Sequence, residues 1–583
     1  MADETIGRRN FLKAAGGTVA TASVAGCFEN GNGNGNGNGN GNGQGSGETL
    51  IYARGAHDVP IDPQQTTSGE VSKVTNQIFD TLVKFEPGSG GQLTAGLATD
   101  YGLDGQTASL TLREGVTFHN GEEFTAEDFE ATYRRFVDSS YDYTLGPDAS
   151  GYGPFTLGNW IDSVEVAGDY ELTIELSQQY APFLRNLAMF ATAVLSKAQI
   201  EGDELGEAPP MPEGDEETPG DNPQTKLGNE VLPVGTGPFE AENIDNQNQR
   251  IQLTASDEYF NPGPSVGGVV FKTIKQNSTR AAEVVNGDSH VTDNLDSQSS
   301  QQIDSADQAE LIRKDGINVG YMAFNMERKE AFRDVTVRRA ISLAVNTEAI
   351  VNDIFEGFAA QADQPLPPDV LGHNDDLDPY PHDPDEAQTM LEDAGYSDLS
   401  FELATFTNPR GYNPSPTTAA NQVKSDLGEI GVEVTINEFS QFGSKYIPYV
   451  YDGKHDAAFL GWYTDNADPD NFLYVLLDPG VDVSAVPDGQ EWVSRDTEGY
   501  SRSNISTWAN TEFMEKVREG QRTYDEAQRR SLYEDATAIA NDRAPWVFID
   551  YAETLRGVND ALDADNFPIS SVGGPFLNRV EFA

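Results

Sequence analysis

The sequence predicts a mixed α/β fold divided into several domains, and three observations lead to this prediction. The chain has 583 residues, which is enough for about two to four domains of ordinary size. Apolar residues make up 37% of the chain and aromatic residues 10%, so a large core can form. Beyond residue 48, short runs that alternate apolar and polar residues are interspersed with segments whose apolar residues recur at helical spacing.

The first element is a segment with the pattern of an export signal. The pair Arg8-Arg9 is followed by Phe-Leu-Lys and by a weakly apolar run of Ala, Gly, Thr and Val that ends at Cys27. This order looks like a twin-arginine signal over residues 1–27 with a lipoprotein processing site, so we expect Cys27 to carry a lipid. The run is too short and too rich in glycine for a permanent membrane-spanning helix. An ordinary flexible N-terminus is the alternative.

The second element, residues 28–47, is a predicted tether. Gly and Asn alternate over residues 30–43, and this composition is typical of a flexible coil. A coil of about 18 residues spans on the order of 20–25 Å, which would let a folded body move near a membrane partner. Cys27 is the only cysteine, so no disulfide can form within the chain and no zinc site can have two cysteine ligands.

The folded body follows from residue 48. Its strands are expected at residues 109–112, 171–176, 269–274, 321–324, 432–436 and 546–549. An amphipathic helix is expected over residues 335–345. Another begins at Asp383, an N-cap residue followed by proline, and ends near Gly395. Residues 201–230 are acidic and rich in Pro and Gly, which indicates a surface insertion and not a domain.

The charge of the chain excludes some partners. The sequence has 37 Lys and Arg against 95 Asp and Glu, a net charge of −58. Nucleic acids and anionic membrane surfaces need a basic footprint, so neither is an expected partner. The acidic residues are scattered through almost every element, which indicates adaptation to high salt, where the Debye length is about 3 Å at 1 M. A moderately acidic protein of ordinary salt is the alternative.

The sequence shows no enzyme motif in a convincing context. It contains no P-loop and no HExxH motif, and the six histidines have no metal-ligand spacing. Residues 263–267, GPSVG, fit the G-x-S-x-G pattern, but they lead into a predicted strand, whereas a nucleophile elbow opens a helix. We therefore expect no enzyme, no cofactor and no metal. A secreted hydrolase that uses carboxylates is kept as an alternative.

A series of short motifs, in a fixed order, runs through most of the body. The motifs are DTLV at 80–83, LREGVTFHNG at 112–121, FTAED at 124–128, VGTGPF at 234–239, RAAEVVNGD at 280–288, VRRA at 337–340 and GWYTDNADPDNF at 461–472. The series resembles the peptide/nickel class (family 5) of extracellular solute-binding proteins that serve ABC importers. It is most similar to the dipeptide-binding branch of that class.

The resemblance implies a two-lobed, periplasmic-binding-protein-like α/β fold of type II, in its three-domain variant. The implied boundaries are 48–318 for lobe 1, with domain II inserted into domain I at about 90–230, then 319–550 for lobe 2 (domain III) and 551–583 for a return to lobe 1. The chain would cross between the lobes near 316–321 and 549–555, and closure about such a hinge is a known class of motion.

The resemblance also implies how a peptide is bound. A zwitterionic peptide buried in a closed site needs a carboxylate for its ammonium and an arginine for its carboxylate. The family pattern places the amine-binding carboxylate at Asp465, with Trp462 as an aromatic wall. Residues 410–414, RGYNP, resemble the carboxylate site, which makes Arg410 the clamp and places Tyr412 beside it. This sequence has Gly411 where a proline is expected, so the stiffness of that loop is in question.

A third part of the implied site comes from lobe 1. Thr67, Ser68 and Gly69 resemble the strip that meets the ligand backbone, and an ordinary turn is the alternative. For Asp465 and Arg410 the alternatives are a surface carboxylate and a surface ion pair, and for Trp462 plain core packing.

The expected function is capture of dipeptides or short oligopeptides for an ABC importer. We expect an exported monomer on the outer face of the cell membrane, held there only by the lipid on Cys27 and docking on the permease subunits. The alternatives are another solute in the same fold (a nickel complex, haem or an oligosaccharide) and a surface sensor that works without a transporter.

Overall fold

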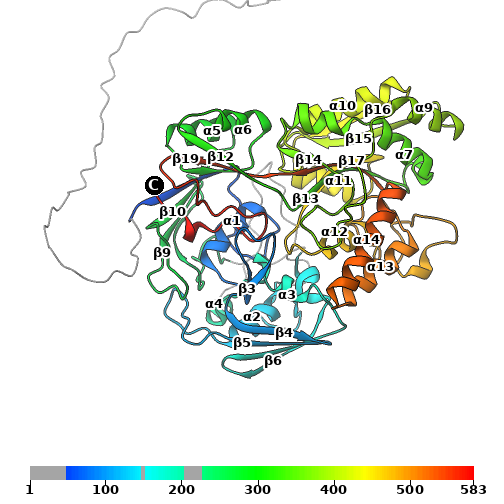
Figure 1. The fold of residues 1–583 in the computed structure, drawn as a ribbon. Helices are drawn as coiled ribbons and strands as arrows, with labels where there is room; N and C mark the ends of the chain where they lie inside the picture. Colours follow the sequence, from blue (N-terminus) through cyan, green and yellow to red (C-terminus); the bar gives the residue numbers. More distant parts are fainter. Residues whose placement is uncertain (1–46, 146–151, 203–225) are drawn as a thin grey trace, which may run out of the picture. The chain divides into compact units, whose positions relative to one another are not determined.

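The computed structural model describes residues 47–145, 152–202 and 226–583. The predicted signal with Cys27, almost all of the tether and most of the acidic insertion lie outside these residues. Three main β-sheets organise the described body, and a two-stranded sheet joins β2 (Val83–Phe85) to β3 (Leu93–Ala95) (Figure 1).

The first sheet has seven strands in the order β12-β19-β11-β1-β10-β9-β8. The N-terminal strand β1 lies at its centre, parallel to both β10 and β11, and the late strand β19 lies between β11 and β12. Helices α1 (Gly69–Ile78), α5 (Asn277–Asn286) and α6 (Ser297–Asp304) belong to the same region. The strands are β1 (Thr49–Arg54), β8 (Phe239–Asp245), β9 (Arg250–Ala255), β10 (Gly268–Thr273), β11 (Val291–Thr292), β12 (Ala309–Lys314) and β19 (Thr554–Asn559).

The second sheet has four antiparallel strands in the order β4-β5-β7-β6. Alternate residues of β5 and β7 are buried, so one face of the sheet covers a core and the other faces solvent. The elements of this region are β4 (Ala98–Asp104), β5 (Thr107–Leu112), α2 (Ala126–Val137), β6 (Ile161–Gly168), β7 (Glu171–Leu176), α3 (Phe183–Asn186) and α4 (Lys197–Gly202).

The third sheet has six strands in the order β14-β18-β13-β17-β15-β16. Its strands β13 and β18 are buried along their whole length. The strands are β13 (Asn318–Phe324), β14 (Ala359–Gln361), β15 (Ser400–Phe406), β16 (Glu433–Phe439), β17 (Ala457–Tyr463) and β18 (Trp546–Ala552). The main helices are α7 (Val335–Ala344), α9 (Pro384–Asp393), α10 (Pro416–Glu429), α12 (Asp470–Leu477), α13 (Thr511–Arg522) and α14 (Glu526–Arg543).

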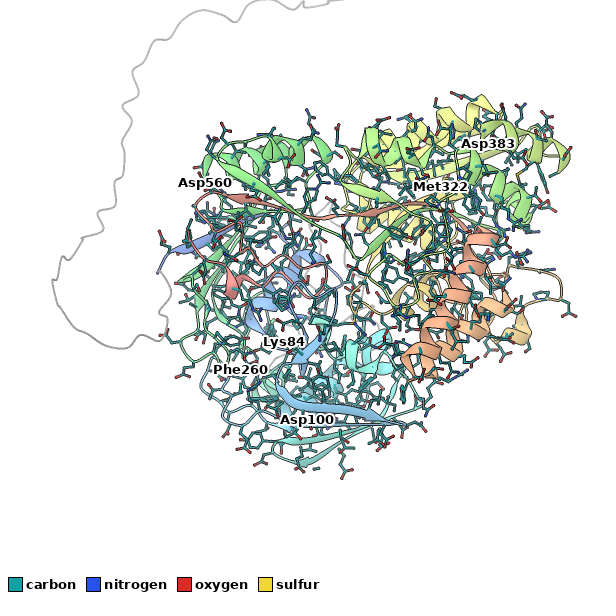
Figure 2. The ribbon with its side chains drawn as sticks, viewed as in Figure 1. Lys84, Asp100, Phe260, Met322, Asp383 and Asp560 are labelled. Carbon is teal, nitrogen blue, oxygen red and sulfur yellow. The ribbon has the colours of Figure 1, made fainter. Side chains whose placement is uncertain are left out.

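Several predicted helices and strands are confirmed, and for α9 the capping contacts that set its ends are visible as well. The Asp383 side chain accepts a hydrogen bond of 3.0 Å from Glu386 N and caps α9, and Gly395 takes a left-handed φ of +82° beyond its end. The predicted strand at 171–176 is β7, and the helix expected at 335–345 is α7. The GPSVG segment is a turn that leads into β10, as expected. In Figure 2, Met322 marks the buried β13 and Asp383 the start of α9.

The chain passes between the seven-stranded and six-stranded sheets at two places that touch. One passage joins β12 to β13, and the other joins β18 to β19. The Asn318 side chain ties them together, because its Nδ2 donates to Ala552 O (2.7 Å) and its Oδ1 accepts from Ala552 N (2.9 Å). A Cβ on Gly316 would lie 2.0 Å from Ala552 O, so this close approach requires glycine. We call this contact the Asn318 junction.

Candidate functional site

Asp465 lies in the loop that follows β17, and it is partly buried. The Tyr152 hydroxyl donates a hydrogen bond of 2.7 Å to Asp465 Oδ2. Tyr152 precedes β6, so this bond joins the region of the four-stranded sheet to the end of the six-stranded sheet. Burial raises the pKa of Asp465 to about 6, and the Tyr152 hydrogen bond opposes that rise. This carboxyl group is therefore able to change its charge near neutral pH.

Asn471, at the start of α12, holds the Asp465 loop and Trp462 in one arrangement. Its side-chain oxygen accepts a hydrogen bond of 2.8 Å from Trp462 Nε1 and one of 3.2 Å from Asp465 N. The Thr464 hydroxyl accepts from Ala467 N at 2.8 Å and tightens the same turn. The positions of the predicted carboxylate and of the predicted aromatic wall are therefore set by a shared acceptor.

Arg410 lies in a loop between β15 and α10 whose two ends bond to each other. Arg410 N donates to Asn413 O at 3.0 Å, and Asn413 N donates to Arg410 O at 2.9 Å. The guanidinium carbon lies 3.7 Å from the centre of the Phe442 ring, a cation–π contact that fixes the plane of the group. Arg410 Nε is buried and has no hydrogen-bond partner among the described residues. In the part of the chain that the structure describes, Arg410 forms no ion pair.

Gly411 explains why the proline of the family pattern is absent. A Cβ at this position would lie 1.5 Å from the Tyr463 hydroxyl oxygen, so that hydroxyl fills the space of a side chain. The loop is held by the bonds between Arg410 and Asn413 instead of by a proline ring.

Tyr412 connects the Arg410 loop to the Asp465 loop. Its ring lies on the backbone of Gly461, where an added Cβ would be 2.3 Å from the ring carbons. The centres of the Tyr412 and Tyr463 rings are 6.0 Å apart. Burial raises the pKa of Tyr412, so the phenol stays neutral. The structure thus brings Arg410, Tyr412, Trp462 and Asp465 to one end of the six-stranded sheet.

Thr67, Ser68 and Gly69 lie at the N-terminus of α1. The Ser68 hydroxyl caps this helix, because it accepts a hydrogen bond of 3.1 Å from Glu70 N, and it donates one of 2.5 Å to Asp58. Thr67 and Gly69 are largely exposed. Among the described residues, no hydrogen bond or ion pair joins this strip to Asp465 or Arg410.

The remaining residues of the Asp465 motif form a buried polar network. Asp468 receives two hydrogen bonds from Arg529, at 2.7 and 2.9 Å. Asp470 accepts from the Tyr180 hydroxyl at 2.9 Å and from Gln521 at 2.6 Å. Burial and then the Asp468 charge raise the pKa of Asp470 to about 7. The roles of Tyr152 and Tyr180 could not be predicted from the sequence, because neither residue belongs to a motif and each lies far along the chain from its partner.

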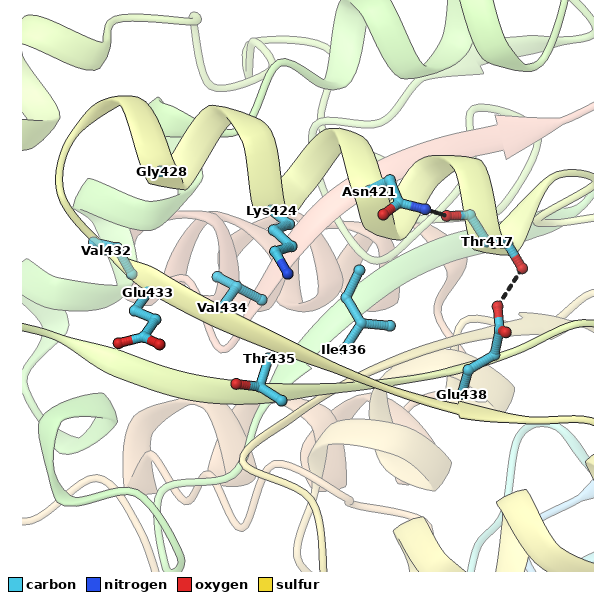
Figure 3. Close-up of a pocket in the computed structure, with 10 residues that line it drawn as sticks. All are labelled: Thr417, Asn421, Lys424, Gly428, Val432, Glu433, Val434, Thr435, Ile436 and Glu438. Carbon is cyan, nitrogen blue, oxygen red and sulfur yellow. Dashed lines mark hydrogen bonds between the residues drawn. The ribbon is translucent and has the colours of Figure 1, made fainter.

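Two open pockets in the described part of the chain lie away from these groups. The larger, of about 650 Å³, lies between α10 and β16, where Figure 3 shows Lys424 above Val434 and Ile436. The smaller, of about 410 Å³, lies beside α2 and β6. Neither is lined by any of the predicted site residues, so we do not assign the ligand site to either. Over the same residues, no group of three or more His, Cys, Asp or Glu side chains could hold a metal ion.

Comparison with known proteins places the chain in a family. The family described as bacterial extracellular solute-binding proteins, family 5 Middle, matches residues 92–483. The dipeptide-binding protein of Escherichia coli K12 is 28% identical over 523 residues, which cover 88% of this chain and 90% of that protein. Di/tripeptide-binding protein 3 of Pseudomonas aeruginosa is 27% identical over 529 residues, which cover 88% and 91%.

Solved structures agree with this placement. The periplasmic binding protein DppA of Helicobacter pylori, in complex with the peptide STSA, is 28% identical with a TM-score of 0.74, covering 92% of this chain and 98% of that one. The dipeptide-binding protein of Pseudoalteromonas sp. SM9913, in complex with Met-Leu, has a TM-score of 0.75 at 24% identity, over 92% and 100%. The predicted α/β fold with two lobes, of type II, is thereby confirmed.

The chemistry of the site and the comparisons agree on a binding role. A carboxyl group and a guanidinium group lie near one end of one sheet, on loops linked by Tyr412 and Tyr463, and the guanidinium has no ion-pair partner among residues 47–145, 152–202 and 226–583. None of the helices in the described residues has the length and apolar character needed to cross a membrane. The chain belongs to the bacterial extracellular solute-binding proteins, family 5.

Proposed function

We propose that the protein captures dipeptides or short oligopeptides outside the cell and delivers them to an ABC importer. The observation that carries the proposal is the unpaired guanidinium group of Arg410, on a loop at the same end of the six-stranded sheet as the Asp465 loop. In a chain with 95 acidic residues, the Arg410 guanidinium has no carboxylate partner among the described residues. In such an acidic protein, an arginine without a carboxylate partner is best explained as a binding group for an anionic part of a ligand. The peptide-binding relatives support the same conclusion.

The two groups would hold opposite ends of the peptide. The ligand ammonium would bind Asp465 beside the Tyr152 hydroxyl, and the ligand carboxylate would bind Arg410, whose plane Phe442 fixes. Each buried ion then has an opposite charge, which removes a cost of several kcal/mol per uncompensated ion. Peptide side chains need no fixed partner in this scheme, so the ligand can vary in sequence.

Other parts of the site would contact the middle of the ligand. We propose that Trp462 forms an aromatic wall and that Tyr412 lies beside the ligand carboxylate. Thr67, Ser68 and Gly69 would present backbone groups from lobe 1 at the start of α1. The roles of Trp462 and Tyr412 are supported by the family motifs and by their contacts with the Asp465 and Arg410 loops. The role of the lobe 1 strip is supported by the family motif alone.

The domain boundaries are part of the same proposal. We propose lobe 1 at residues 48–318 and 551–583, with domain II inserted at about 90–230, and lobe 2 at residues 319–550. The membership of the sheets supports these boundaries. Strands β1, β8–β12 and β19 form one sheet, β13–β18 form a second, and β4–β7 form a third.

The N-terminal sequence supports a proposal about location. We propose that the twin-arginine signal exports the chain and that a lipid on Cys27 anchors it at the outer face of the membrane, with residues 28–47 as tether. The protein would act as a monomer, adapted to high salt, that docks on permease subunits and has no enzymatic activity.

Calorimetric titration with a dipeptide library, in high salt, tests the proposal. We expect Asp465→Ala and Arg410→Ala each to raise Kd by about a hundredfold, because each leaves one ligand charge unpaired at a cost of about 3 kcal/mol. Asp375→Ala and Arg502→Ala are matched controls, since both side chains are exposed and neither touches the site. Unchanged affinity in both site variants, with the fold intact, would remove the assigned roles.

A further inference from the structure

Asp550 is a buried carboxyl group without a partner among the described residues. It lies in β18, is 1% exposed, and neither of its carboxyl oxygens has a hydrogen-bond partner in that part of the chain. The other buried aspartates in the described residues each accept a hydrogen bond or an ion pair: Asp62, Asp80, Asp128, Asp293, Asp426, Asp468, Asp470 and Asp478. Among the buried aspartates of the described residues, Asp550 alone has neither a hydrogen bond nor an ion pair.

The surroundings of Asp550 are backbone and aromatic rings. Asp550 pairs with Gly320 on the neighbouring strand, and a Cβ on Gly320 would lie 2.1 Å from Asp550 Oδ1 and 2.6 Å from Tyr412 O. Gly320 in turn pairs with Gly461, on which the Tyr412 ring lies. The carboxyl group therefore sits beside the Tyr412 backbone, on the face of the sheet that carries the Arg410 loop.

An unpaired buried carboxylate is expensive, so this group needs an explanation. Burial raises the pKa of Asp550 well above its usual value, so the surroundings favour the neutral acid over the carboxylate. No lysine, arginine or histidine of the described residues lies within ion-pair distance of it. A cation that would pair with the ionised form of Asp550 therefore has to come from outside the described residues.

Asp550 lies next to the groups assigned to the ligand. Tyr412 follows Arg410 by two residues, and Tyr463 precedes Asp465 by two. Burial raises the pKa of Tyr463, and an ionised Asp550 would raise it further, so the two side chains are electrostatic neighbours. Tyr463 is 37% exposed, whereas Asp550 is closed off. Tyr463 is therefore a neighbour of Asp550 that solvent reaches, and it belongs to the same strand end as Asp465.

We propose that Asp550 forms an acidic subsite that takes the cationic side chain of a lysine or arginine residue in the bound peptide. This inference rests on the proposed peptide-binding function and adds a preference for basic ligands to it. The ammonium or guanidinium group passes along the Tyr463 ring and pairs with the Asp550 carboxylate. The proton of the neutral acid leaves to solvent as the cation arrives, so the charge of the subsite stays balanced.

Titration with two dipeptides of equal length tests the subsite. Ala-Lys and Ala-norleucine differ by the terminal ammonium, and we expect the wild-type protein to bind Ala-Lys at least about tenfold more tightly, the effect of one charge-assisted hydrogen bond. Asp550→Asn removes the charge at constant shape, and both ligands should then bind equally. Asp363→Asn is the matched control, since Asp363 accepts from Tyr551 on the opposite face of β18, and this variant should keep the preference.

Proton release gives a second readout that needs no variant. Binding enthalpies measured in buffers of different ionisation enthalpy should show about one more proton released with Ala-Lys than with Ala-norleucine, because only the cation ionises Asp550. Equal affinities for the two ligands, or a lysine preference that survives in Asp550→Asn, would overturn the subsite. If neither dipeptide binds the wild-type protein, the peptide-binding function itself fails. If Ala-norleucine binds without any lysine preference, only the subsite fails.

Discussion

Gly411 shows how one residue can be required by a neighbour far away in the sequence. The Tyr463 hydroxyl occupies the place of its side chain, so any larger residue would push that ring away from Tyr412. The ring contact between Tyr412 and Tyr463 connects the loops of Arg410 and Asp465. The departure from the family pattern at Gly411 is therefore accommodated by this packing and leaves the Arg410 loop ordered by its own backbone bonds.

The sequence predicted part of the site and could not predict the rest. Asp465, Arg410, Trp462 and Tyr412 stand in motifs, so the family resemblance pointed to them, and their ligand roles stay predictions. Tyr152 and Asn471 carried no such signal, because their importance comes from a contact and not from a pattern. The isolation of Asp550 is a property of its surroundings, and no sequence rule separates it from the other acidic residues.

The ionisation of Asp465 predicts how binding depends on pH. The pKa of this carboxyl is about 6 in the empty protein, so at lower pH the ammonium must displace a proton before it can bind. We expect Kd to be nearly constant between pH 7 and 6.5 and to rise about tenfold by pH 5, since affinity falls tenfold per pH unit below the pKa. Titrations of one uncharged-side-chain dipeptide across this range measure the effect.

The matching control is Asp465→Asn, which carries no titrating group at this position. Its affinity should be low and independent of pH over the same range. A variant profile as steep as that of the wild-type protein would show that another group controls the pH dependence.

The elements of the fold follow from two kinds of signal. Helix α9 was predictable because its N-cap aspartate, its first-turn proline and its terminal glycine are neighbours in the sequence. Strand β7 was predictable from alternation, since one face of its sheet meets solvent. Strand β16 runs to Phe439, beyond the expected end at residue 436, because pairing with β15 continues past the alternating run. The Asn318 junction joins residues 234 positions apart, and such a contact leaves no local pattern.

The Asn318 junction predicts a stability effect that is large for an asparagine. Asn318→Ala would leave the N–H and C=O groups of Ala552 buried without partners, at a cost of about 2–3 kcal/mol in the free energy of unfolding. Denaturant unfolding in high salt measures this cost. Asn421→Ala, which loses one exposed hydrogen bond to Thr417 O on α10, should stay within about 0.5 kcal/mol of the wild type. Equal effects of the two substitutions would contradict the role of the junction.

The charge of the whole chain sets the conditions under which it folds. With 95 acidic and 37 basic residues, most carboxylates have no cation to pair with, so they repel one another across the entire surface. At 1 M salt the Debye length is about 3 Å and this repulsion is largely screened, whereas at 0.01 M it extends to about 30 Å.

Dialysis from high to low salt tests this effect on the whole molecule. We expect the far-UV circular dichroism signal of helix and sheet to weaken as the salt is removed, and to return when the salt is restored. A neutral osmolyte at the same osmolarity is the control, since it does not screen charge. A spectrum that is the same at low and high salt would contradict adaptation to high salt.

The Asn318 side chain, which links the two passages of the chain at Ala552, would also set the direction in which a bound peptide leaves. Because these two hydrogen bonds hold the two connections together, the lobes proposed above would pivot about this contact when they open. When two lobes pivot about one contact, the gap between them opens most at the edge farthest from that contact and least beside it. A captured peptide would therefore be handed over through the rim opposite Asn318, and this is the rim that a membrane partner would have to face.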